Sequence, residues 1–145
     1  MAITQALANS FKKQLLDGDH SFASGSDVYK IALYSSSATL NSATTSYTTG
    51  NEVGASGQYT AGGGALVNGG TSIASGVAIV DFADRSFTGV TLTARGALIY
   101  NTSATVANAA VAALDFGADK TATSGTFTIQ FPAFTTAAAI LRISG

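Results

Sequence analysis

Hydrophobic positions in the first part of the chain recur with the period of a helix. The apolar residues that fall four positions apart are Leu7, Phe11 and Leu15. Such spacing is typical of one narrow apolar face of a helix. Thr4 is placed to cap the first turn with its hydroxyl, and Gly18 suits the left-handed residue that often follows a last turn. We therefore predict an N-terminal helix within residues 1–18.

The rest of the chain shows short apolar runs and alternation of period two, the pattern of strands with one buried face. Phe127, Ile129 and Phe131 alternate with polar residues, and Pro132 ends this run because it lacks an N–H group. Residues 76–82 are nearly all apolar, as expected of a central strand. The predicted strands cover residues 27–34, 65–68, 76–82, 90–100, 106–116, 126–131 and 138–143.

A long polar connection, residues 35–64, separates the first strand from the later ones and is rich in Ser, Thr, Gly and Tyr. Structureless loops of more than about 15 residues are uncommon inside a compact domain. Either short strands form at 44–47 and 58–60, or the segment is an arm. Tyr47 and Tyr59 lie within it. Tyrosine is a frequent interface anchor, but both rings could equally cover the ends of the protein's own sandwich, and both readings stay open.

Two stretches of the sequence resemble each other. Val80-Asp81-Phe82-Ala83-Asp84-Arg85 is echoed by Leu114-Asp115-Phe116-Gly117-Ala118-Asp119-Lys120. Each reads as a strand that ends in an Asp-bearing turn, which predicts two similar hairpins in one sandwich. Gly96, inside an apolar run, indicates a bulge or a close approach of two backbones.

These patterns together predict an all-β fold. Many short strands with Gly-rich turns and one short N-terminal helix are typical of an antiparallel β-sandwich or jelly roll. Strands do not alternate with long helices, which argues against a doubly wound sheet. A length of 145 residues suits one domain, so we assign residues 1–145 to a single β-sandwich domain.

Composition narrows the classes of function. Charged residues make up 10% of the chain and the net charge is −1, against about 25% charged residues in ordinary domains. The seven basic residues are scattered, so a nucleic-acid partner is not expected. No apolar run is long enough to span a membrane, so a membrane partner is not expected. Without a recognisable signal peptide, we expect synthesis in a cytoplasm.

Candidate catalytic chemistry centres on His20, the one histidine of the sequence. It could act as a general base oriented by Asp19. No Gly-x-Ser-x-Gly nucleophile motif accompanies it, so we interpret His20 as a polar residue of the loop after the helix. We expect no catalytic residues and no enzymatic activity.

Candidate metal ligands are carboxylates in predicted turns. Asp17-Gly18-Asp19 begins like a calcium loop, but the later ligands of such a loop do not follow at the required spacing. Two further pairs could hold calcium: Asp81 with Asp84, and Asp115 with Asp119. Aspartate in a turn more often accepts hydrogen bonds from its own backbone. The chain also has no cysteine. We expect no metal and no cofactor.

Several stretches resemble small virion proteins of tailed bacteriophages. The matching segments run over almost the whole chain and are SFKKQLLDG (10–18), KIALYSSSATL (30–40), YTAGG (59–63), ARGALIYN (94–101), LDFG (114–117) and TFTIQFP (126–132). This resemblance implies a structural role in the virion. The chain is similar in kind to capsid decoration proteins, also called cement proteins, of jelly-roll fold. Such proteins bind the outside of the shell and bridge major capsid subunits. The resemblance carries over no catalytic residues.

The expected partners are then the major capsid protein and copies of the chain itself, as a dimer or trimer on the capsid surface of the virion. The resemblance also implies that the protein is made in the cytoplasm of the bacterial host. The candidate interface residues are Leu7, Phe11, Leu15, Tyr47 and Tyr59. The alternative is a tail, collar or baseplate component, which copy number would separate from a cement protein. A receptor- or glycan-binding module comes third, and a small hydrolase last.

Overall fold

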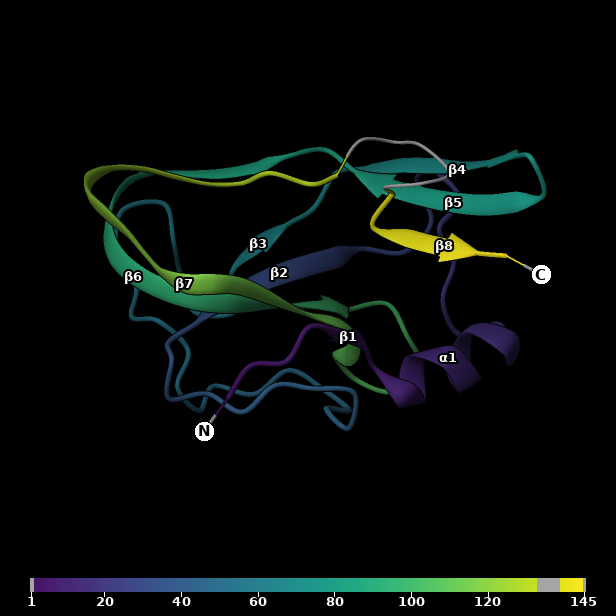
Figure 1. The fold of residues 1–145 in the computed structure, drawn as a ribbon, viewed down its shortest axis with the longest axis horizontal. Coiled ribbons are helices and arrows are strands. Elements are labelled where there is room, and N and C mark those ends of the chain that lie inside the picture. The colour runs from purple at the N-terminus through teal and green to yellow at the C-terminus, as the bar shows by residue number, and fades with distance from the viewer. Residues whose placement is uncertain (1, 133–138, 145) are drawn as a thin grey trace.

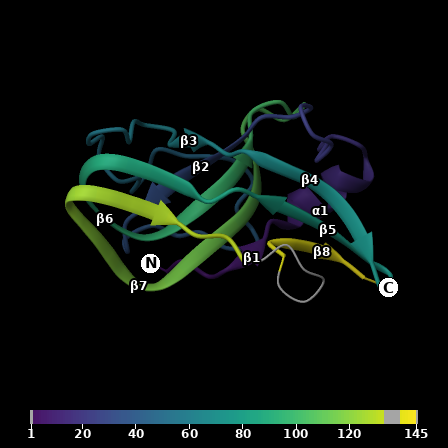
Figure 2. The ribbon, with the colours of Figure 1, turned by 90° about the horizontal axis from the view of Figure 1, so that it is seen from above.

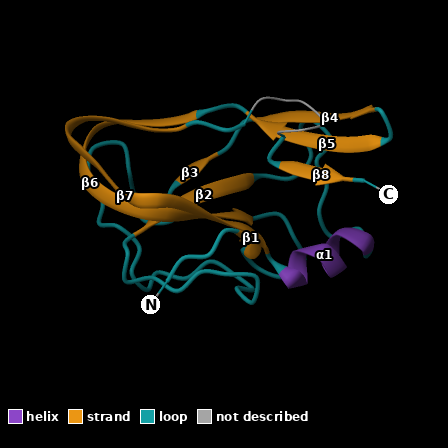
Figure 3. Ribbon diagram, viewed as in Figure 1, coloured by secondary structure: helices purple, strands orange, loops and turns teal. Residues whose placement is uncertain are grey.

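The computed structural model describes residues 2–132 and 139–144, and within these ranges the chain forms eight strands and one short helix in an all-β sandwich (Figures 1 and 3). The elements are β1 (Ala6–Leu7), α1 (Asn9–Leu16), β2 (Tyr29–Tyr34), β3 (Gly64–Ala65), β4 (Asn68–Ala74), β5 (Val77–Phe82), β6 (Arg85–Asn101), β7 (Ala109–Ile129) and β8 (Leu141–Ile143). One sheet has the order β1-β7-β6-β2-β3 and the other β4-β5-β8, with antiparallel pairing between the named strands. The predicted fold class is confirmed.

The longest elements, β6 and β7, form one hairpin that bends through both layers of the sandwich (Figures 1 and 2). The first half of β6 and the second half of β7 lie level with the β4-β5-β8 sheet, and the other halves pair with β2 and β1. In the first half of β6 buried residues alternate with exposed ones, at Phe87, Val90, Leu92 and Ala94 among others. This is the period-two pattern read from the sequence.

The bend is built by two glycines and an ion pair. The β6–β7 register shifts between Ala94 and Gly96, and Gly117 has a φ of +80°, a conformation that glycine adopts without steric cost. Asp115 Oδ1 accepts from the Gly117 N–H at 2.9 Å and lies 3.2 Å from Arg95 Nε. These two partners, the backbone N–H first, lower the pKa of Asp115. A Cβ at Gly96 would overlap the Leu114 carbonyl oxygen, so Gly96 lies at a close approach of two backbones, as predicted.

The predicted repeat is wrong in its second copy. Val80–Arg85 does end one strand and start the next, but residues 114–120 lie inside the continuous strand β7. The physical reason is the bend itself. Within β7, glycine lets the strand curve and aspartate accepts a hydrogen bond from the irregular backbone. At the end of a strand, the same two residue types form a turn.

The polar connection lies against the larger sheet. Backbone bridges join Ser46 to Ala109 and Glu52 to Tyr34, while no strand forms at 44–47 or 58–60. With the N-terminal segment it covers the outer face of β2 and of the adjoining halves of β6 and β7, where nearly every residue is buried. Those strands therefore read as continuous apolar runs, because both of their faces are covered.

The helix is shorter than predicted. It begins at Asn9 after Ala8, which makes no side-chain cap, and Thr4 instead donates its backbone N–H to Leu40 at 2.8 Å. Thr4 is therefore not the cap, because residues 6–7 are extended and pair with β7 as β1. The end of the helix is as predicted: Gly18 has a φ of +83°. The N–H groups of Gly18 and Asp19 bond the last carbonyls, which closes a Schellman motif.

Other predicted strands agree in position but differ in extent. Residues 27–34 correspond to β2, and residues 76–82 to β5, the middle strand of its sheet. The strands predicted at 106–116 and 126–131 are joined in β7. The last predicted strand is present as β8, and Ala138 at its start lies outside the described residues. The described helix is not long and apolar enough to cross a membrane.

Aromatic rings fill the space between the layers near the helix. Phe22 stacks on Tyr29 of β2 at a centroid distance of 4.6 Å, and Phe82 of β5 lies 5.6 Å from the same tyrosine. Phe11 of α1 meets Phe22 edge to face at 6.0 Å. Offset and edge-to-face pairs add stability beyond the area they bury. This cluster joins the helix, the larger sheet and the smaller sheet.

The bend gives a first prediction. A Cβ at Gly96 would overlap the Leu114 carbonyl oxygen and press on the Ile3 side chain. Gly96→Ala should therefore destabilise the protein by about 1–3 kcal/mol, the usual cost of overpacking. Gly54→Ala is the matched control, because a Cβ there meets nothing within 4 Å. Urea unfolding measures both variants, and equal midpoints would contradict this account of the bend.

Candidate functional site

In Figure 1, α1 and the sheet β4-β5-β8 face each other at the same end of the domain. The hollow between them is an apolar groove. We call it the α1–β8 groove. Its volume is about 490 Å³, within the range of natural ligand and peptide sites. Its large apolar lining residues include Phe11, Leu15, Leu16, Ile79, Leu141 and Ile143.

The groove is closed at its floor and open at its rim. Phe11 is 2% exposed and belongs to the core, and Leu15 is half-buried. Leu16 is 89% exposed and Ile143 61% exposed, although both line the groove. Leucine and isoleucine side chains that stand this far in water on both sides of a hollow are typical of a surface that another molecule covers.

The sequence prediction found one wall of this groove and missed the other. Leu7, Phe11 and Leu15 all line it, although Leu7 does so from β1 and not from the helix. Ile79 and Ile143 come from β5 and β8, on the opposite wall. Their strands were predicted, but the pairing that turns them toward α1 leaves no signal in the sequence.

Among the described residues that line the groove, the charged side chains are all positive. Lys12 of α1 and Arg142 of β8 are the charged side chains of this set, and both are exposed cations. Lys12 Nζ donates to Asn9 Oδ1 at 3.3 Å. The groove therefore offers an apolar floor beside positive charge.

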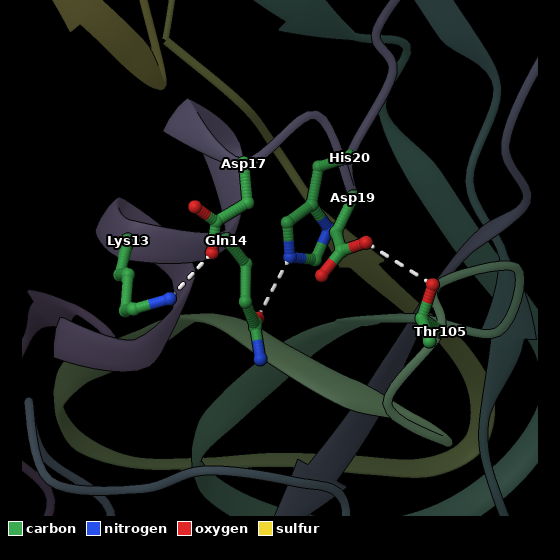
Figure 4. A network of polar contacts seen from close by, with 6 residues as sticks. All are labelled: Lys13, Gln14, Asp17, Asp19, His20 and Thr105. Atoms are coloured by element: carbon green, nitrogen blue, oxygen red, sulfur yellow. Dashed lines mark hydrogen bonds and ion pairs between the residues drawn. The ribbon is translucent and has the colours of Figure 1, made fainter.

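His20 also lines the groove, and it belongs to a chain of buried and partly buried polar groups. Its Nε2 is 2.9 Å from Gln14 Oε1 and its Nδ1 is 2.9 Å from Asn101 Nδ2 (Figure 4 shows the Gln14 side). Asn101 is fixed by two other contacts: Asp27 accepts from Nδ2 at 2.8 Å, and Oδ1 accepts from the Ser103 N–H at 2.8 Å. Because the amide nitrogen faces His20, Nδ1 must accept and Nε2 must carry the proton.

In this arrangement His20 stays neutral, and both of its ring nitrogens have hydrogen-bond partners. Burial lowers the pKa of His20 and outweighs the opposite effect of Asp27 and Asp19. Asp19 accepts from Thr105 at 3.1 Å and makes no hydrogen bond to the imidazole (Figure 4). Because both ring nitrogens already have partners, the geometry assigns His20 a structural part, joining α1 to the end of β6.

The tyrosines of the polar connection gather on Glu52, away from the groove. Tyr59 donates to Glu52 Oε1 and accepts from the Leu33 N–H, both at 2.8 Å, while Tyr47 donates to Oε2 at 2.6 Å. Tyr59 is fully buried, and Tyr47 is half-buried with its ring stacked on Tyr100 at 4.8 Å. The structure thus places Tyr59 in the chain's own core. Burial raises the pKa of the Tyr100 hydroxyl to about 12.

Three of the carboxylates considered as metal ligands, Asp17, Asp84 and Asp115, have protein partners, whereas the buried Oδ1 of Asp81 has no hydrogen-bond partner. Asp17 pairs with Lys13 at 2.6 Å, and Asp84 accepts from the Phe131 N–H at 2.8 Å (Figure 4 draws the first pair). Together with Asp115 at the bend, they serve local structure. Across the described part of the chain, no three His, Cys, Asp or Glu side chains gather as a metal site would require.

The His20 network predicts a pH dependence of stability. Unfolded His20 takes up a proton near pH 6.5, but the folded protein resists it because the pKa is lowered. Stability should therefore fall as the pH drops from 7 toward this lowered pKa, by up to about 1.4 kcal/mol per unit. His20→Gln should flatten this slope. Unfolding free energies between pH 7.5 and 5 measure it, and parallel slopes for both proteins would refute the assignment.

The Glu52 cluster predicts unequal effects of two similar substitutions. Tyr59→Phe leaves the buried Leu33 N–H without a partner and should cost about 1–3 kcal/mol. Tyr47→Phe removes one bond from a half-buried group and should cost about 0.5–1.5 kcal/mol. Chemical unfolding of the two variants compares them, and a larger loss for Tyr47→Phe would contradict the cluster's role.

Comparison with known proteins supplies no family for this chain. No family model matches it, and neither a curated protein nor a solved structure is significantly similar to it.

Proposed function

We propose that the protein is a structural component of a tailed-phage virion, a capsid cement protein that binds the outside of the shell and bridges neighbouring major capsid subunits. The observation that carries the proposal is the open apolar rim of the α1–β8 groove, with Leu16 and Ile143 in water. Burying one such side chain contributes about 1.5–3 kcal/mol. The virion role itself is inferred from the segments of the sequence that resemble small virion proteins.

The outer face of the bent hairpin also suits repeated contact between subunits. Ser86 bonds Thr128 at 2.9 Å and Thr93 bonds Thr121 at 2.8 Å, hydroxyl to hydroxyl across the two strands. These side chains are exposed, short and already ordered. They lose little further rotamer freedom when a partner covers them, which favours a binding role for this face.

Rigidity is the second requirement of a cement protein, because a bridge across a seam must resist extension. The connection 35–64, the least regular part of the chain, is held by Glu52 and its tyrosines and by backbone bonds to the larger sheet. Breaking the polar contacts inside this cover would leave buried groups unpaired. We propose copies of the chain, as a dimer or trimer, and the major capsid protein as its partners.

The proposal is tested on particles from a phage whose gene for this protein has been deleted. Such particles should assemble but release their DNA at a lower temperature than wild-type particles, because contacts across the seams are missing. Adding the purified protein should restore the wild-type release temperature. Particles that are equally heat-stable but lack a complete tail, or fail to adsorb to cells, would contradict the proposal and favour a tail component or a receptor-binding module.

A further inference from the structure

The exposure of the groove's rim indicates how large its occupant is. A small molecule held inside the hollow would touch the floor, at Phe11 and Leu15, and leave the outer side of the rim in water. Leu16 at 89% and Ile143 at 61% exposure flank the hollow on opposite walls. An occupant that covers both must extend over the rim, which a polypeptide segment does.

The charge beside the groove indicates whether its occupant is the same groove of a second copy. Two grooves facing each other about a two-fold axis would bring two Lys12 and two Arg142 side chains together. Like charges brought together in an interface are unfavourable, and they select against the wrong partner. A segment that carries carboxylates beside its apolar residues would instead match both the floor and the rim.

We infer that the α1–β8 groove receives an apolar polypeptide segment bearing acidic residues, supplied by the major capsid subunit. This inference rests on the proposed function and names the surface through which it acts. The apolar side chains of the segment cover Leu16 and Ile143, and its carboxylates lie beside Lys12 and Arg142. The bridging contact to the shell then runs through α1 and β8, on the side of the domain away from the hairpin bend (Figure 1).

The experiment measures binding of the purified protein to particles that lack it, by co-sedimentation over a range of protein concentrations. The test variants are Leu16→Asp, which places a charge on the rim, and the double variant Lys12→Glu with Arg142→Glu. Each should weaken binding about tenfold or more, as expected for central contacts of an interface. All three positions are exposed, so the fold should persist, and melting curves check that it does.

Two matched controls separate the groove from general surface effects. Ile73→Asp makes the same kind of change at an isoleucine of β4 that is 72% exposed and does not line the groove. Lys13→Glu reverses an exposed charge on α1 that does not line the groove. Both should bind particles as the wild-type protein does.

The outcomes separate this inference from the proposed function. If the wild-type protein binds particles and the groove variants bind equally well, the groove is not the contact, although the cement role stands. If the double charge variant alone is unaffected, the partner segment is not acidic and the inference fails in that part. If the wild-type protein does not bind particles, the proposed function and this inference both fall. A wild-type dimer in solution that Leu16→Asp dissociates would identify the occupant as a second copy, which overturns the inference.

Discussion

The bend in the β6–β7 hairpin is the constraint on which the rest of the fold depends. Because Gly96 and Gly117 let the ribbon turn, and Asp115 holds the turn to Arg95 and to backbone, one pair of strands runs through both layers. The sandwich is therefore closed at the end where the hairpin bends. At the other end of the domain α1 lies opposite the sheet β4-β5-β8 (Figure 1). The groove opens between them.

Two buried polar centres fix the segments that the sheets alone would leave loose. Glu52 ties the polar connection to β2 through Tyr59, and His20 ties the end of the helix to β6 through Asn101. In each centre the hydrogen bonds fit one arrangement of donors and acceptors. At His20, for example, they fix which ring nitrogen carries the proton. Buried networks of this kind define one arrangement of the chain more than they add net stability. A firmly held helix in turn gives the groove a fixed wall.

Local patterns allowed much of the fold to be predicted, and long-range pairing explains the rest. The alternation at 126–131, the apolar run at 76–82 and the positive φ at Gly18 each depend on neighbours in sequence, so they could be read directly. Residues 114–120 could not, because the same Asp and Gly chemistry serves turns and bulges. Likewise, Leu7, Phe11 and Leu15 revealed one wall of the groove. Ile143 on the other wall is placed by pairing of β8 with β5, which only the folded chain defines.

Three features are expected of a subunit that acts through surfaces covered by a partner. They are a low charge, short hydroxyl side chains on one face, and an open apolar rim beside cations on another. The central claim, that it cements a capsid, is tested most directly by the number of copies per virion, measured by quantitative mass spectrometry against the major capsid protein. The account predicts a ratio near one, or a simple fraction of one. A ratio of a few per cent would contradict it and assign the protein to the tail or neck.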